Sequence, residues 1–157
     1  MKKALLLPVA FALILGACNN NQKEKVDYSA DSTSTQQTAG GQATEDAVKS
    51  DVDEDAIIRS GFKSADGIPT VVDFSATWCG PCRQFKPIFH QTAADYKGKV
   101  DFISIDVDTY QRLSEKYGVQ SIPCIIYFDA NGKEMSRTVG FLGQEEFNVR
   151  IDQLLGK

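Results

Sequence analysis

The sequence lacks features that several classes of protein need. No run of basic residues interrupts its globular part and the formal net charge is −4, so nothing indicates a nucleic-acid-binding surface. The longest apolar run has about a dozen residues, whereas a permanent transmembrane helix needs about twenty. With 157 residues, the chain is long enough for one domain and short for two.

Ligands for a structural metal ion are also few. The chain has one histidine and four cysteines, and Cys79 and Cys82 form its single pair separated by two residues. A structural zinc ion needs four ligands, usually two such pairs or one pair with histidines. Besides this pair the chain offers Cys18, Cys124 and His90. We therefore favour a redox-active pair over half of a zinc site, and we expect no metal and no cofactor.

What the chain does contain is the motif WCGPC at residues 78–82. The preceding residues 70–74 form a short run rich in β-branched side chains, which predicts a buried strand. Residues 83–97 carry apolar side chains at helical spacing, which predicts an amphipathic helix. The motif therefore lies at a strand-to-helix junction, with Cys79 at the start of the helix.

This position favours thiolate chemistry at Cys79. A helix N-terminus presents unpaired N–H groups and a partial positive charge, both of which stabilise a thiolate. Cysteines in such motifs have pKa values lowered from about 8.5 to roughly 3.5–7.5. We therefore expect Cys79 to be the attacking nucleophile and Cys82, one turn further along, to be the buried resolving thiol. Pro81 falls in the first helical turn, where a missing N–H costs little.

Around this motif the chain resembles the thioredoxin family. The likeness covers about the last 107 residues. Besides the motif, it rests on short matches at Val72-Asp73-Phe74, Ala76, Pro87, 103–108, Tyr117-Gly118-Val119, Ser121-Ile122-Pro123, Tyr127-Phe128, Asn131-Gly132 and Val139-Gly140. The resemblance implies a thioredoxin fold and thiol–disulfide oxidoreductase activity through a redox-active Cys79–Cys82 disulfide.

Asp73 interrupts an apolar strand, where an unpaired carboxylate is costly. In thioredoxins the matching aspartate is buried beneath the resolving cysteine and assists its proton transfer, and the resemblance implies this catalytic role for Asp73. Desolvation would raise the pKa of such a carboxyl, as a proton relay near neutral pH requires. The alternative is an edge position from which Asp73 reaches solvent.

The resemblance also implies a substrate-binding surface around the motif. Pro123 is expected to be cis, which leaves the backbone of Ile122 free to pair with an extended substrate segment. Trp78 is expected to form an apolar rim beside the nucleophile. The further substrate-binding residues that the resemblance implies are Gly80, Pro81 and Gly140.

Three residues depart from the family pattern. Ser75 stands where tryptophan is common, and Phe102 stands where many members carry a lysine that pairs with the buried aspartate. Without that cation, the proton affinity of Asp73 would change. Cys124 stands where threonine is common, directly after the proline. It is either a small buried hydrophobe or a third thiol close enough to modulate the motif.

The N-terminal part is predicted to deliver the protein to a membrane. Residues 1–17 combine two lysines with a short apolar run, which is typical of a signal peptide. The sequence Leu15-Gly16-Ala17-Cys18 resembles a bacterial lipoprotein cleavage site, so we expect Cys18 to be lipidated and to anchor the chain; the alternative is an ordinary cleaved signal. Residues 18–50 are polar and are expected to form a disordered tether.

The folded domain is expected to span residues 51–157. Its class is α/β, with a central mixed sheet, helices on both faces, and a first strand that is missing or degenerate. A first helix should run from about residue 53 to Gly67, and Asp108-Thr109 should cap a short helix that ends at Tyr117. The remaining strands are expected at 100–107, 124–128 and 134–139, with a last helix at 144–155.

Together these features predict a lipid-anchored protein-disulfide reductase of the bacterial cell envelope, facing the periplasm. Its expected substrates are disulfide-bonded envelope proteins, its electron donor a membrane thiol reductase, and its state a monomer. Two alternatives stay open. One is a disulfide oxidase or isomerase that works with a membrane oxidase, and the other is a peptide-binding or chaperone module without catalysis.

Overall fold

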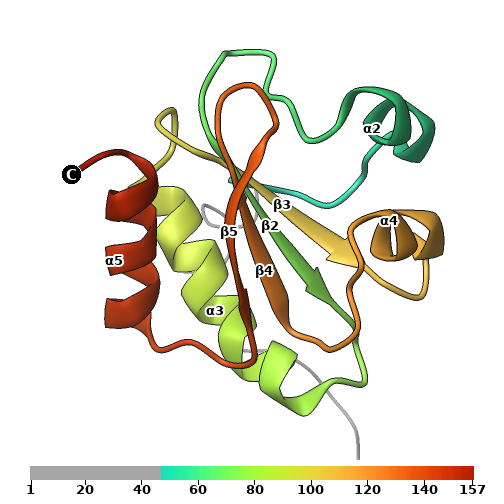
Figure 1. Cartoon of the computed structure of the whole chain (residues 1–157). Helices are drawn as coiled ribbons and strands as arrows, with labels where there is room; N and C mark the ends of the chain where they lie inside the picture. The colour runs from blue at the N-terminus through green and yellow to red at the C-terminus, as the bar shows by residue number, and fades with distance from the viewer. Residues whose placement is uncertain (1–46) are drawn as a thin grey trace, which may run out of the picture. The chain divides into compact units, whose positions relative to one another are not determined.

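A computed structural model describes residues 47–157, which form a five-stranded sheet with helices on both faces (Figure 1). The strands and helices alternate along most of the chain. In chain order they are β1 (Val48–Lys49), α2 (Glu54–Ser60), β2 (Thr70–Ser75), α3 (Gly80–Asp95), β3 (Asp101–Asp106), α4 (Gln111–Lys116), β4 (Cys124–Phe128), β5 (Glu134–Val139) and α5 (Gln144–Leu154).

The sheet is mixed, as predicted, with the strand order β1-β3-β2-β4-β5. The strands β1, β3 and β2 run parallel, since each of the first two connections crosses over through a helix. The strands β2, β4 and β5 are antiparallel neighbours, and β4 and β5 are joined through the hairpin at Asn131-Gly132. This order places β2, which leads into the WCGPC motif, at the centre of the sheet.

The first strand is present but has only two residues, Val48 and Lys49. They pair with Phe102 and Ile103 of β3. The prediction that the first strand is missing is therefore wrong, and the alternative prediction of a degenerate first strand is confirmed. Because β1 lies within residues 18–50, which the sequence predicts to be the tether, folded structure begins before Asp51.

Two apolar cores lie on opposite faces of the sheet. On one face, α3 and α5 cover side chains of β2, β3 and β4; the largest buried members of this core are Phe85, Phe89, Phe102, Tyr127 and Phe147. On the other face lie α2 and α4, and the largest buried members are Phe62, Phe74, Ile105, Leu113, Ile126 and Phe128. Figure 1 shows α3 and α5 to the left of the sheet and α2 and α4 to its right. We call these the α3 face and the α4 face.

Two helix ends differ from the prediction. The helix α2 ends at Ser60 rather than near Gly67, because Gly61 adopts a positive φ of 78° that a helix cannot continue through. Before α4, Asp108 and Thr109 do not cap the helix. Instead the Asp106 carboxylate accepts hydrogen bonds from both of their N–H groups, at 2.9 and 3.2 Å, and α4 begins at Gln111.

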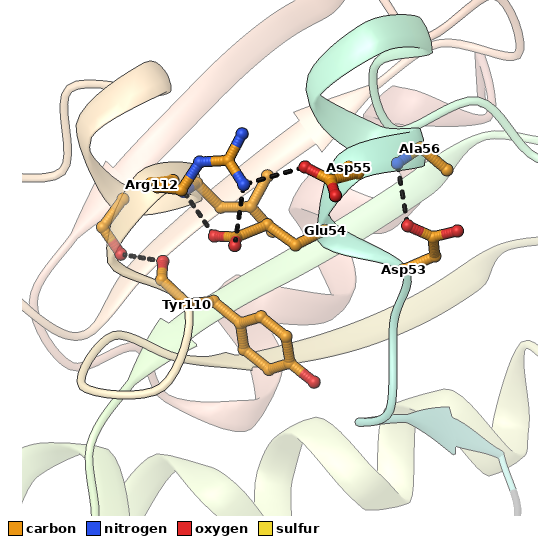
Figure 2. A network of polar contacts seen from close by, with 8 residues as sticks. Asp53, Glu54, Asp55, Ala56, Tyr110 and Arg112 are labelled. Carbon is orange, nitrogen blue, oxygen red and sulfur yellow. Dashed lines mark hydrogen bonds and ion pairs between the residues drawn. The ribbon is translucent and has the colours of Figure 1, made fainter.

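A group of charged side chains joins the N-terminal ends of α2 and α4 (Figure 2). Asp53 caps α2 by accepting from the N–H of Ala56, and Arg112 of α4 donates to Asp55 at 2.8 Å. Glu54 accepts from the N–H of Leu113 at 3.3 Å. Because Arg112 and Asp55 are exposed to solvent, this network orients α2 more than it stabilises the fold.

The predicted signal peptide, the lipidated Cys18 and most of the predicted tether lie outside the described residues. Within residues 47–157, no helix has the length and apolar character to cross a membrane.

Candidate functional site

The WCGPC motif joins the carboxyl end of β2 to the first turn of α3, as the sequence predicted. Cys79 is the N-cap of α3, and its Sγ accepts a hydrogen bond from the N–H of Cys82 at 3.2 Å. The two cysteines form a disulfide with an S–S distance of 2.01 Å. This pair can therefore exist as a disulfide at a helix N-terminus, where a released thiolate would face the unpaired N–H groups of the first turn.

Apolar side chains enclose the disulfide. Cys79 is 5 % exposed and Cys82 is 3 % exposed, and both form a small cluster with Ala76. Val107, which follows β3, and Ile122, which precedes β4, pack against this cluster. The disulfide consequently lies where the loops after β2 and β3 meet the loop before β4.

The Ile122–Pro123 peptide bond is cis, as the resemblance implied. Gly140, at the end of β5, donates its N–H to the carbonyl oxygen of Pro123 at 2.8 Å. The loop that carries Pro123 is therefore tied to the neighbouring loop at Gly140. These two loops and the motif lie at the same end of the sheet, which brings together predicted substrate-binding residues from three segments.

Trp78 lies on the surface, with 66 % of its area exposed. Its indole Nε1 donates to Oδ2 of Asp108 at 2.8 Å, which fixes the orientation of the ring beside the disulfide. Phe141 is a second exposed aromatic residue near this end, at 49 %. The sequence does not indicate that Asp108 contacts Trp78, because a contact across 30 residues carries no local pattern.

Asp73 is buried in the central strand with 4 % of its area exposed. The alternative of an edge position is therefore wrong. Its Oδ1 has no hydrogen-bond partner among the described residues. Burial raises the pKa of Asp73 to about 7, and the nearby hydroxyl of Ser75 acts in the opposite direction. A carboxyl with this pKa can both accept and release a proton near neutral pH.

A cavity of about 360 Å³ opens beside Asp73 on the α3 face. Its wall includes Asp73, Ser75, Cys82, Lys86, His90 and Ser104. We call it the Asp73 cleft. The sequence does not predict that Lys86, His90 and Ser104 lie beside Asp73, because their place depends on how α3 packs on the sheet and on the register of β3.

Cys124 lies on the α4 face, within the core that contains Phe74 and Ile126. It is 1 % exposed, and burial raises the pKa of its thiol. It belongs to a different cluster from Cys79 and Cys82. This placement favours the interpretation of Cys124 as a small buried hydrophobe over that of a third reactive thiol.

The known proteins to which this chain is similar in sequence or structure are thioredoxins. The family model described as Thioredoxin matches residues 55–153. The thioredoxins of Staphylococcus aureus strains MW2 and COL are each 39 % identical over 105 residues, which cover 67 % of this chain and 93 % of theirs. Among solved structures, the thioredoxin of Malassezia sympodialis matches with a TM-score of 0.58 and 28 % identity, covering 68 % of this chain and 89 % of that one.

Proposed function

The chain belongs to the thioredoxin family and is a thiol–disulfide oxidoreductase, and from this premise we propose that it reduces protein disulfides in the bacterial cell envelope. The observation that carries the proposal is the Cys79–Cys82 disulfide at the N-terminus of α3. A glycine and a proline separate the two cysteines, as in reducing thioredoxins, whose potential lies near −270 mV.

In the proposed reaction, the Cys79 thiolate attacks one sulfur of a substrate disulfide. This forms a mixed disulfide and releases the first substrate sulfur as a thiolate, which takes up a proton. Cys82 then loses its proton and attacks Cys79 Sγ, which re-forms the Cys79–Cys82 disulfide and releases the second substrate thiol. Two electrons pass from the enzyme dithiol to the substrate disulfide in each turnover.

The second step needs an acceptor for the Cys82 proton, and we assign this role to Asp73. Asp73 and Cys82 line the same cleft, and the carboxyl has a pKa of about 7. It is therefore half ionised at neutral pH, so it can take the proton while Cys82 attacks and return it to solvent afterwards.

The substrate segment is proposed to bind at the end of the sheet where the motif lies. The exposed Trp78 supplies an apolar rim, and the Ile122 backbone before the cis proline offers groups for pairing with an extended chain. The remaining proposed contacts are Gly80, Pro81, Pro123 and Gly140.

A reductant in an oxidising compartment needs an external source of electrons. We therefore propose a membrane thiol reductase as donor and disulfide-bonded envelope proteins as substrates. Lipidation at Cys18 would hold the monomeric enzyme beside this donor, on the periplasmic side of the membrane. Replacement of Cys18 by serine should move the protein from the membrane fraction to the soluble fraction of cells, and retention in the membrane would contradict the lipid anchor.

The catalytic proposal is tested by insulin reduction with dithiothreitol as electron source. The Cys79→Ser variant should lose all activity above that of dithiothreitol alone, because the nucleophile is removed. Cys82→Ser should instead trap a mixed disulfide through Cys79, since no thiol remains to resolve it. No insulin reduction by the unmodified protein, together with substrate binding that Cys79→Ser retains in full, would favour a peptide-binding module.

A further inference from the structure

The carboxyl group of Asp73 has two hydroxyl groups beside it in the sheet. Ser75 follows two residues later on β2, so its side chain points to the same face. Ser104 is the register partner of Asp73 on the parallel strand β3. Both serines line the Asp73 cleft. The α3 face is thus polar around Asp73, although it is apolar two residues earlier on each strand, at Val71 and Phe102.

The cleft continues outward to the edge of the sheet. A second cavity of about 240 Å³ shares Ser50, Lys86, His90 and Ser104 with the first and extends to Val48. It lies where β1 ends, because this strand pairs only with Phe102 and Ile103 and leaves the rest of β3 uncovered. The short β1 therefore leaves a polar opening from the sheet edge toward Asp73 and Cys82.

The two cavities are large enough to hold several water molecules, since one water occupies about 30 Å³ in the liquid, and their walls carry polar groups that could bind water. We propose that the Ser75 hydroxyl binds the Asp73 carboxyl directly and that Ser104 positions water against it, so that the cleft carries protons between this carboxyl and solvent. The inference rests on the proposed role of Asp73 as proton acceptor and assigns two positioning residues to that role.

Other charged or titratable groups also lie around Asp73. From α3, Arg83, Lys86 and His90 line the cleft together with Cys82, and Asp106 lines it from β3. Cys124 of β4 lies on the opposite face of the sheet, and the charge of Asp73 contributes to the raised pKa of its thiol. The pKa of Asp73 itself is set first by burial and next by the Ser75 hydroxyl. Ser75 is therefore the group whose removal should change it most directly.

The test uses the full-length chain with Cys18→Ser, so that no lipid is attached, and follows the Asp73 carboxyl by NMR of labelled aspartate. Ser75→Ala should raise the pKa of Asp73 by about one unit, the size expected for the loss of one hydrogen bond to a charged group. At pH 7 the carboxylate fraction would then fall from about a half to about a tenth. Disulfide reduction should accordingly slow about fivefold at pH 7 and remain unchanged at pH 9.

Matched variants separate a positioning role from a structural one. Ser75→Thr keeps the hydroxyl and should restore the pH profile, while Ser136→Ala, an exposed serine on β5, should leave it unchanged. Ser104→Ala should shift the profile in the same direction by a smaller amount, because its hydroxyl acts through water. The circular dichroism spectrum of the Ser104→Ala variant should match that of the parent chain, as expected if the fold is unchanged.

The proposal is wrong if Ser75→Ala and Ser104→Ala both keep the parent pH profile and the parent pKa of Asp73. Asp73→Asn distinguishes this failure from that of the proposed function. If Asp73→Asn slows reduction at pH 7 while the serine variants do not, only the role of the serines is contradicted. If Asp73→Asn does not slow reduction at pH 7 either, then both the role of the serines and the role of Asp73 as proton acceptor are contradicted.

Discussion

The two faces of the sheet each bury one titratable group near the active-site end, and the surroundings of these groups differ. On the α3 face, Asp73 is 4 % exposed but borders a cleft with hydroxyl groups and a resolving cysteine. On the α4 face, Cys124 is 1 % exposed and is enclosed by aromatic and aliphatic side chains of the core. The strand register brings Cys124 opposite Phe74, next to Asp73 in the chain.

Burial alone does not decide whether such a group takes part in chemistry. Desolvation raises the pKa of both groups, because it penalises the charged form. The pKa of Asp73 rises into the neutral range and the group has a polar cavity beside it, so it can exchange protons. The thiol of Cys124 already has a high ordinary pKa, so burial keeps it protonated and inert.

The largest effect is expected for Asp73→Asn on the α3 face. The folded-state pKa of about 7 lies above the ordinary value of 3.8, so the folded protein retains a proton that the unfolded chain loses. The contribution of Asp73 to the free energy of unfolding is therefore fully present below about pH 4 and is lost as the pH rises through about 7. Asparagine removes this penalty and should raise the free energy of unfolding by up to roughly 4 kcal/mol at pH 8, with little change at pH 4.

Urea unfolding of the oxidised protein at pH 4, 6 and 8 measures this difference. Asp66→Asn, an exposed aspartate in the loop before β2, is the matched control and should change little at any pH. An Asp73→Asn variant with the pH dependence of the parent protein would show that the carboxyl is not held at a raised pKa. The contrast between the two faces would then disappear.

A smaller effect is expected for Cys124→Ala on the α4 face. Loss of one buried sulfur atom should cost about 1 kcal/mol of unfolding free energy, as for other small truncations in a core. The rate of insulin reduction should not change. In the folded protein Cys124 should resist alkylation, and it should react fully in urea. Rapid alkylation of Cys124 under native conditions would support the alternative that it is a third reactive thiol.

Much of the fold could be predicted from local patterns. Residues 124–128 and 134–139 were predicted as strands with their observed bounds, because an apolar run and an Asn-Gly turn mark them clearly. The two residues of β1 form no pattern of their own, since their pairing with β3 alone makes them a strand. The end of α2 at Gly61 was missed because the apolar Phe62 continues the helical spacing but packs from the following loop.

In the candidate site, too, local patterns predicted some residues, while others depend on contacts between distant segments. The motif identified Cys79 and Cys82 together with their position at the start of a helix, because that chemistry is encoded within five residues. The proximity of Ser104 to Asp73 and of Asp108 to Trp78 depends on strand register and loop packing. No local pattern carries such contacts. The cleft beside Asp73 could not be predicted, since it follows from the shortness of β1 and the position of α3.

The most direct test of the account is the reduction potential of the Cys79–Cys82 pair. It would be measured against glutathione in the full-length Cys18→Ser chain, with Cys124→Ala as a parallel sample. We predict a value near −270 mV in both samples, as for a reducing thioredoxin whose third thiol lies outside the site. A value above about −180 mV would contradict the reductase and favour an oxidase or isomerase. A shift caused by Cys124→Ala would contradict the contrast between the two faces.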